Sequence, residues 1–235
     1  MRIAVTGANG FVGRHVVARL AGRHEVRALI SERPGAESEL PPGSFDVRRA
    51  DVRKPETLRG QFDDIDAVVH TVAVPTERAQ RFAEVNVAGV AHVVDEARRA
   101  GVRRIVHMSA LGADPRSPFP YLRSKGEGQA IVAALEHAEI SGAYEVGGPQ
   151  AVTYDQMLAE TMRGAGTRRP TLHVPVLLMK PPAVVMGLFM KDPPVTVDQL
   201  DLLKADNTPR SNAMEPVFGV HPRQFQGALG YLRSP

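Results

Sequence analysis

The fold is decided by the stretch Met1-Arg-Ile-Ala-Val-Thr-Gly-Ala-Asn-Gly-Phe-Val-Gly13, in which an apolar strand runs straight into three glycines. Apolar residues at helical spacing follow the last of them. Gly7 permits a tight turn, Gly10 lets backbone amides approach a pyrophosphate, and Gly13 lets the helix pack closely. The phosphates would lie at the positive N-terminal end of this helix. The stretch therefore predicts a dinucleotide phosphate site.

The first half of the chain alternates between strands and helices. Short apolar runs without polar alternation are typical of strands buried on both faces. After the first strand they recur at residues 25–30, 45–50, 66–71 and 104–109. Between the last two runs, residues 83–100 carry apolar side chains at helical spacing, and Gly101 ends that helix. Repeated βα units predict an α/β fold with a doubly wound parallel sheet.

The second half has a different character. A helix is expected over residues 121–138, followed by a short strand and turn over 142–148. Thr153 is the expected N-cap of a helix that ends at Gly164, and a last helix is expected over 197–205. We interpret residues 1–128 as a nucleotide-binding domain and residues 129–235 as a small C-terminal lobe on the substrate side.

Composition narrows the classes of function. The 235 residues carry a net charge of +3, and the arginines are scattered without interleaved aromatics, so nucleic-acid binding is not expected. The absence of cysteine excludes disulfides and zinc–thiolate sites and fits a reducing cytoplasm, our expected location. A core strand that begins at residue 2 leaves no room for a signal peptide.

One apolar segment late in the chain needs an explanation. Residues 183–190 are too few to span a bilayer, and Lys180-Pro181-Pro182 separates them from the apolar residues 174–179. A packing or interface helix is the favoured interpretation. Peripheral contact with a membrane surface is the alternative.

Tyr121 and Lys125 are the strongest candidates for chemistry. They stand four residues apart at the start of an expected helix, so both project from one face. A nearby ammonium favours the phenolate, which would lower the pKa of the tyrosine and make it a general acid or base. The pair follows the fifth strand, at the carboxyl edge of the sheet where open α/β folds bind ligands.

These motifs together resemble the extended and atypical short-chain dehydrogenase/reductase superfamily, whose nucleotide-binding part is a Rossmann fold. Within it, the chain most resembles the NAD(P)H-binding branch related to the accessory subunit of mitochondrial complex I that carries this fold. The resemblance rests on residues 6–13, Asp51-Val52, His70, Asn86-Val87, Ser109, Tyr121-Leu-Arg-Ser-Lys125, and the segments 106–113, 143–149 and 197–207.

The resemblance implies roles for individual residues. Tyr121 would donate the proton, Lys125 would hold the nicotinamide ribose, and Ser109 would polarise a substrate carbonyl; a strand-end serine bonded to backbone is the alternative for Ser109. His70 and His107 are interpreted as packed strand residues. The remaining cofactor contacts would come from Gly7, Asn9, Gly10, Phe11, Val12 and Gly13 at the pyrophosphate, Asp51 and Val52 at the adenine, Thr71, Val72 and Ala73 below the ribose and nicotinamide, and Asn86.

The choice of cofactor follows from charge. Members of the family that prefer NAD usually place an acidic residue just after the second strand, where this chain has Ser31. Arg14 and Arg33 could both reach a 2′-phosphate, whereas Glu32 would repel it if it turned inward. We therefore favour NADP(H) over NAD(H).

The family pattern breaks after Lys125. Gly128 joins Gln129 directly, where the family layout has a further strand and βα unit, so about 50–70 residues of that layout are missing. Either the protein lacks them, which leaves the sheet short, or the gene product contains a stretch absent from this sequence. We favour the second explanation, because a deletion would expose an unpaired sheet edge. An intact mass of 25.4 kDa would contradict it.

Two functions remain open. The first is an oxidoreductase that moves hydride between NADP(H) and a carbonyl or sugar-like small molecule. The second is a cofactor-binding protein without turnover that serves assembly or redox sensing, with contacts like those of the complex I subunit. Self-association into a homo-oligomer is left open for both.

Overall fold

The structure of the chain is a computed structural model that describes residues 1–76, 81–133, 142–190 and 193–229. It divides into two compact units, Met1–Ser141 and Gly142–Pro235, which are described separately below.

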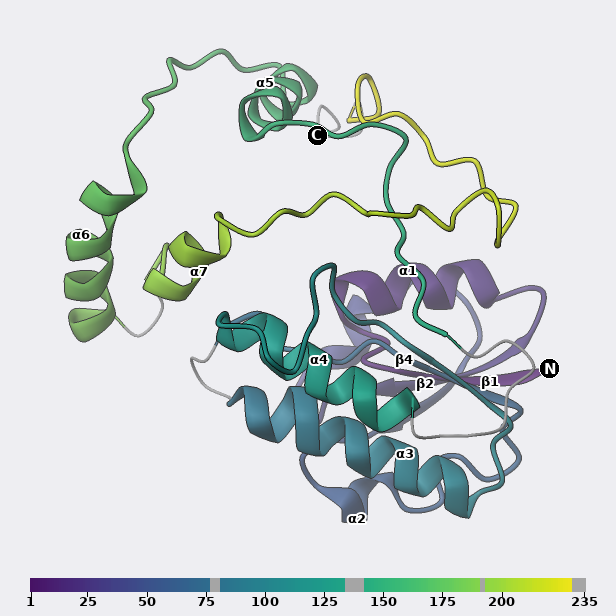
Figure 1. Cartoon of the computed structure of the whole chain (residues 1–235). Helices are drawn as coiled ribbons and strands as arrows, with labels where there is room; N and C mark the ends of the chain where they lie inside the picture. Colours follow the sequence, from purple (N-terminus) through teal and green to yellow (C-terminus); the bar gives the residue numbers. More distant parts are fainter. Residues whose placement is uncertain (77–80, 134–141, 191–192, 230–235) are drawn as a thin grey trace. The chain divides into compact units, whose positions relative to one another are not determined.

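The first unit is built on a five-stranded parallel sheet (Figure 1). Its order, β3-β2-β1-β4-β5, reverses direction after β1, which confirms the predicted doubly wound topology. Val5 of β1 faces Ala28 on one side and Val69 on the other. All five strands fall on the predicted runs, with ends that differ by at most two residues, at β1 Arg2–Thr6, β2 Glu25–Ile30, β3 Asp46–Arg49, β4 Ala67–His70 and β5 Arg104–His107.

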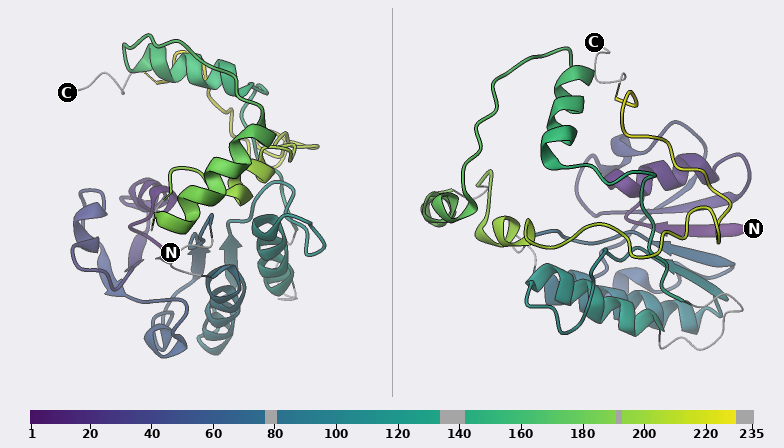
Figure 2. Two further views of the ribbon diagram at one scale, coloured as in Figure 1. Left: turned by 90° about the vertical axis from the view of Figure 1, so that its left-hand side faces the viewer. Right: turned by 45° about the horizontal axis from the view of Figure 1, so that its top comes forward.

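Helices cover both faces of this sheet. Helix α1 lies on one face, and α3 and α4 lie side by side on the other (Figures 1 and 2). The predicted helix over residues 83–100 is present, but it opens with a π-helical turn, η2, before the regular α3. The bounds are α1 Phe11–Leu20, η1 Ala36–Glu39, α2 Pro55–Leu58, η2 Ala83–Ala88, α3 Gly89–Arg99 and α4 Pro120–Ala133.

Successive strand residues serve opposite faces, so the sheet carries two cores. Val5 and Ala28 pack with Val17 of α1, whereas Ala4 and Leu29 pack with Val93 of α3. This division is the reason that the strands read as continuous apolar runs without a polar alternation.

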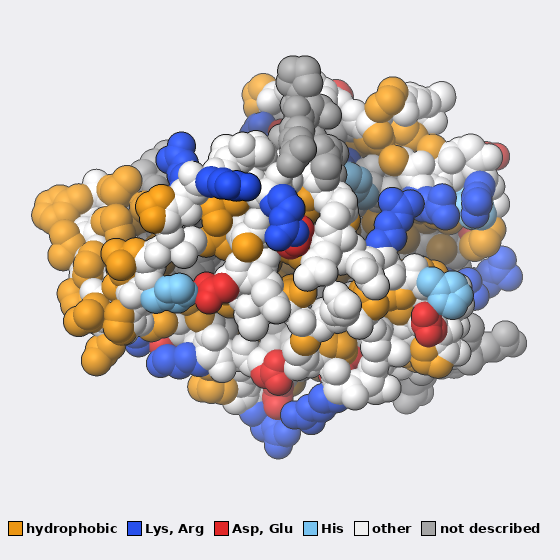
Figure 3. Space-filling view, turned by 90° about the horizontal axis from the view of Figure 1, so that it is seen from above, with side chains coloured by type: hydrophobic (Ala, Val, Ile, Leu, Met, Phe, Trp, Pro, Cys, Tyr) orange, Lys and Arg blue, Asp and Glu red, His pale blue; other side chains and the backbone are white. Residues whose placement is uncertain are grey.

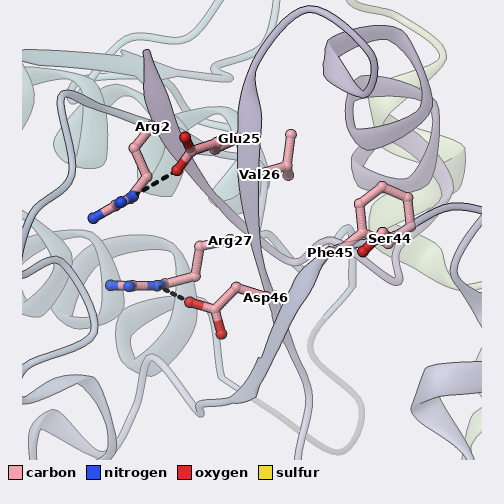
Figure 4. Close-up of a pocket in the computed structure, with 7 residues that line it drawn as sticks. All are labelled: Arg2, Glu25, Val26, Arg27, Ser44, Phe45 and Asp46. Atoms are coloured by element: carbon pink, nitrogen blue, oxygen red, sulfur yellow. Dashed lines mark hydrogen bonds and ion pairs between the residues drawn. The ribbon is translucent and has the colours of Figure 1, made fainter.

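The amino ends of the strands carry ion pairs (Figure 4). Arg27, only 6% exposed, donates to Asp46 across 2.6 Å and also to the carbonyl oxygens of Gln61 and Asp63. Arg2 pairs with Glu25 at 3.1 Å. The Nε and Nη1 donors of the buried Arg27 are thus satisfied by protein, and we interpret the pocket that Arg2, Arg27 and Asp46 help to line as a structural feature.

The sheet ends at β5, which is one of its two edge strands. Within the described residues no strand pairs with the outer edge of β5, and Val106 is 52% exposed. Helix α4 continues through Gly128 and Gln129 without a break. This is the short sheet that the first explanation of the missing residues describes, and the intact mass of the gene product remains the test of both.

The described part of the second unit contains three helices, α5 Tyr154–Gly164, α6 Val176–Phe189 and α7 Val197–Leu202. Thr153 caps α5 as predicted, through a reciprocal capping box with Gln156. The strand expected over residues 142–148 is reduced to a single bridge from Glu145 to Asn212. The end of the helix expected over residues 121–138 lies outside the described residues.

Helix α6 corrects the expectation that Pro181 and Pro182 separate two apolar segments, because both prolines lie inside it. The first of them is the sixth residue of the helix, and the prolines remove backbone donors without ending it. Most of its apolar side chains are exposed, with Leu177 at 78% and Leu188 at 77%, whereas Ala183 is buried. Hydrophobic side chains gather at the left of Figure 3. Among the described residues, no helix has the length and apolar character needed to cross a bilayer.

Candidate functional site

The glycine turn lies at the carboxyl end of β1. Gly7 has φ +71°, and a Cβ there would come within 2.9 Å of Val72. A Cβ on Gly13 would lie 2.0 Å from the carbonyl oxygen of Gly7, so α1 can begin this close to the turn only with glycine. Gly10 is the N-cap of α1 and offers no capping side chain, which leaves the first-turn amides for a ligand.

The segment after β4 is held against this turn. The hydroxyl of Thr71 donates to the carbonyl oxygen of Thr6 at 2.7 Å. Asn86, predicted as a cofactor contact, instead bonds both backbone groups of Val74, at 2.9 and 3.1 Å, and donates to Ser124 Oγ at 3.0 Å. It is 1% exposed, so in this structure it connects the segment below the ribose to helix α4.

A cluster of polar side chains occupies the carboxyl ends of β1 and β2. Asn9 accepts a hydrogen bond from the backbone of Ser31 at 3.2 Å and donates to Glu39 at 2.8 Å. Arg33 donates to the other carboxylate oxygen of Glu39 at 2.5 Å. Glu32 forms an ion pair with Lys54 at 2.6 Å, so the acid that was expected to repel a phosphate has a cationic partner there. The structure thus brings Asn9, Ser31 and Arg33 together around Glu39.

The residues expected at the adenine are held by protein contacts. Asp51 receives two hydrogen bonds from Arg53 Nε, at 3.0 and 3.1 Å, and this guanidinium lowers the pKa of the carboxyl. Val52 is 5% exposed and belongs to the core under α3. Of the residues expected at the pyrophosphate, Phe11 is exposed, with the Arg14 guanidinium 5.4 Å from its ring centroid.

Lys125 is buried at the carboxyl end of β5. Its side chain is 2% exposed, and Nζ donates to the carbonyl oxygen of Met108 at 2.6 Å. Burial lowers the pKa of the ammonium to about 8. One recorded hydrogen bond leaves two donors of this ammonium for a ligand hydroxyl.

Tyr121 lies in the first turn of α4, with its ring 6.0 Å from that of Phe82. Burial raises the pKa of its phenol. This reverses the expectation that Lys125 lowers it, because burial disfavours the charged phenolate.

Ser109 has a partner of its own. Its hydroxyl donates to Gln129 Oε1 at 2.9 Å, across to the middle of α4. The hydroxyl is therefore placed beside the helix that carries Tyr121 and Lys125, and its proton is engaged by Gln129 before any substrate arrives.

Two histidines stack beneath this region. The rings of His70 and His107 lie 5.2 Å apart, and Thr6 Oγ1 is 2.6 Å from Nδ1 of His70. Their other ring nitrogens have no hydrogen-bond partner in the described part of the chain. Burial, with the charge of Lys125 as a lesser cause, lowers the pKa of His107 to about 4. Both therefore pack as neutral strand residues, as the sequence predicts.

Sequence reasoning missed Glu39 and Gln129. Glu39 lies eight residues beyond Ser31 in a loop rich in proline and glycine, where no periodicity indicates its direction. Gln129 lies four residues after Lys125, and that helical spacing was the available signal.

The glycine turn and the partly paired Lys125 lie at one edge of a parallel sheet that reverses order after β1. These features fit a dinucleotide and define the class of dinucleotide-binding α/β domains. A family model described as NAD(P)H-binding matches residues 7–141, more than half of the chain. The chain belongs to this NAD(P)H-binding family.

Curated relatives are similar over the first unit. Sterol demethylase protein B from Methylococcus capsulatus is 37% identical over 117 residues, which make up 48% of this chain and 35% of that protein. An L-arabinose 1-dehydrogenase (NAD(P)(+)) from Haloferax volcanii is 38% identical over 111 residues, 46% of this chain and 40% of that protein. A uronate dehydrogenase from Pseudomonas putida is 34% identical over 112 residues, 46% of this chain and 40% of its own length. The chain spans 35 to 40% of the length of these three relatives.

Solved structures agree on the fold. The crystal structure of gox2253 aligns with 97% of this chain and 95% of its own, with a TM-score of 0.64 at 18% identity. A mutated uronate dehydrogenase covers 69% of this chain and 68% of its own, with a TM-score of 0.53 at 20% identity. At these identities the likeness concerns the Rossmann-like architecture alone.

Proposed function

We propose that the chain is an NAD(P)(H)-dependent oxidoreductase of the short-chain dehydrogenase type, acting on a carbonyl or sugar-like substrate. The observation that carries the proposal is the place of Lys125, whose Nζ is buried at the carboxyl end of β5 one helical turn from Tyr121. A buried lysine that has no carboxylate partner among the described residues stabilises the fold little by itself, so a ligand role accounts for it best.

The proposed chemistry assigns one task to each side chain. The bound cofactor would supply or accept the hydride. Tyr121 would transfer a proton at its phenolic oxygen, for which a raised pKa keeps the proton in place at neutral pH. Lys125 would donate to ribose hydroxyls, and the Ser109 hydroxyl would turn from Gln129 Oε1 to donate to the substrate oxygen.

The proposal includes a preference for NADP(H). Ser31 offers no carboxylate at the end of β2, and Arg33 and Arg14 stand near the same edge. The lack of cysteine suits a reducing compartment, so a cytoplasmic location belongs to the proposal as well.

The first test is the substitution Tyr121→Phe. Aldoses and uronates, which the names of two relatives indicate, would be screened with NADPH and NADH consumption as the readout. Loss of the phenolic proton should reduce turnover by about 100-fold or more and leave the cofactor dissociation constant nearly unchanged. Tyr154→Phe, an exposed tyrosine of α5, is the matched control. Unchanged turnover in Tyr121→Phe would contradict the acid/base role.

A second function, cofactor binding without turnover, is favoured by one specific observation. The Ser109 hydroxyl is already engaged by Gln129, which withholds a donor that a reductase would direct at its substrate. Tight NAD(P)H binding with no turnover across the panel would support this function over the first.

A further inference from the structure

Glu39 holds a position that the sequence did not single out. It is the last residue of η1, and its two carboxylate oxygens face different partners. Asn9 of the glycine turn donates to one at 2.8 Å, and Arg33 donates to the other at 2.5 Å. The carboxylate therefore joins the loop after β2 to the loop after β1.

This carboxylate lies where a dinucleotide fold places the adenosine ribose. Asn9 also bonds the backbone of Ser31, the first residue after β2, at 3.2 Å. In such folds the residue at this strand end contacts the 2′-hydroxyl, or a nearby arginine contacts a 2′-phosphate. Here Ser31 brings no charge, and both an acid and an arginine are present in one ion pair.

We propose that Glu39 limits how strongly the site prefers NADPH over NADH, an inference that rests on the proposed cofactor site. The carboxylate is an internal anion that competes with a 2′-phosphate for Arg33 and Asn9. Towards a ribose without that phosphate it is an acceptor for hydroxyl protons.

The surrounding charges support a competition of this kind. The hydrogen bonds from Arg33 and Asn9 lower the pKa of Glu39, and the charge of Arg14 adds to this effect, so the carboxylate is ionised at neutral pH. A phosphate with nearly two negative charges cannot share the site with it without repulsion. Arg33 is 59% exposed, so it can leave the carboxylate at little cost.

The experiment compares Glu39→Gln with Glu37→Gln. Glu37 lies on the same short helix and carries the same charge, but it pairs with Arg49. Dissociation constants for NADPH and NADH would be titrated by nicotinamide fluorescence on the full chain. The affinities of adenosine 2′,5′-bisphosphate and of 5′-AMP, each measured by competition with the cofactor, differ by the contribution of the 2′-phosphate. Thermal unfolding checks that each variant is folded.

Glu39→Gln should tighten NADPH and adenosine 2′,5′-bisphosphate by about fivefold or more and change NADH and 5′-AMP by less than about threefold. Glu37→Gln should change neither ratio. The inference fails if both variants shift the two cofactors alike, and then the proposed function still stands. If the unmodified protein binds neither cofactor, the proposed function and the inference fail together.

Discussion

At the scale of single residues, His70 and His107 make the folded chain less stable at acidic pH. Their stacked rings are buried beside Lys125, and both pKa values are lowered, that of His107 to about 4. Above pH 6.5 the imidazoles are neutral in the folded and the unfolded chain. Below it, the unfolded chain binds protons that the folded chain excludes, at His107 until about pH 4, so the free energy of unfolding falls as the pH falls through this window.

His107→Phe should therefore flatten this dependence. Phenylalanine keeps an aromatic face against His70 and removes one titrating group. Between pH 6.5 and 4 the slope of the unfolding free energy should decrease by up to about 1.4 kcal/mol per pH unit relative to the unmodified chain. Urea unfolding at pH 7.5, 6 and 5 measures it. Identical profiles for the two proteins would show that His107 takes no part.

At the scale of elements, the junction of β1 and α1 is the most constrained part of the fold. The turn has room for backbone alone at Gly13, whose hypothetical Cβ meets the Gly7 carbonyl oxygen. Any side chain must push the start of α1 away from the turn. The same shift would move the first-turn amides away from the phosphates they are proposed to bind.

Gly13→Ala should lower both stability and cofactor affinity. Overpacking against backbone costs about 2–3 kcal/mol of unfolding free energy. The Kd for NAD(P)H should also rise, because a displaced helix start moves its first-turn amides away from the phosphates. Gly187→Ala in α6 is the control, since nothing lies within 4 Å of its Cβ position. Denaturant unfolding measures the stability, and fluorescence titration measures the cofactor affinity. A Gly13→Ala protein with normal affinity would argue against the phosphate site.

The elements differ in how far the sequence predicts them. The strands of the sheet were predictable because burial on both faces forces continuous Val- and Ile-rich runs, and the glycine turn because each glycine has a steric reason. The prediction of a strand within residues 142–148 was wrong, since the segment itself ends in two neighbouring glycines and only Glu145 pairs. Glu39 was not predictable, because its direction depends on Asn9, which the fold brings near from the loop after β1, as well as on Arg33 in its own loop.

At the scale of the whole molecule, the site and the sheet belong to one unit. Both hydrophobic cores, every proposed catalytic and cofactor residue and the family match to residues 7–141 fall within Met1–Ser141. The second unit contains its own capped helices and the bridge between Glu145 and Asn212.

A fragment of residues 1–141 should consequently fold by itself and bind NAD(P)H. Since both cores and the proposed site are retained, its Kd should lie within about threefold of that of the full chain. Circular dichroism during urea unfolding tests cooperativity, and the fluorescence titration tests binding. A fragment that unfolds without a cooperative transition would place part of the stability in the second unit.

The ion-paired pocket at the amino ends of the strands has a practical consequence. Ser44, which lines it, is exposed and lies at the sheet edge opposite the glycine turn (Figure 4). The chain has no cysteine, so Ser44→Cys would create its single thiol. A dye attached there would label every molecule at one known position, far along the strands from the nucleotide edge, and would leave that edge free for ligand measurements.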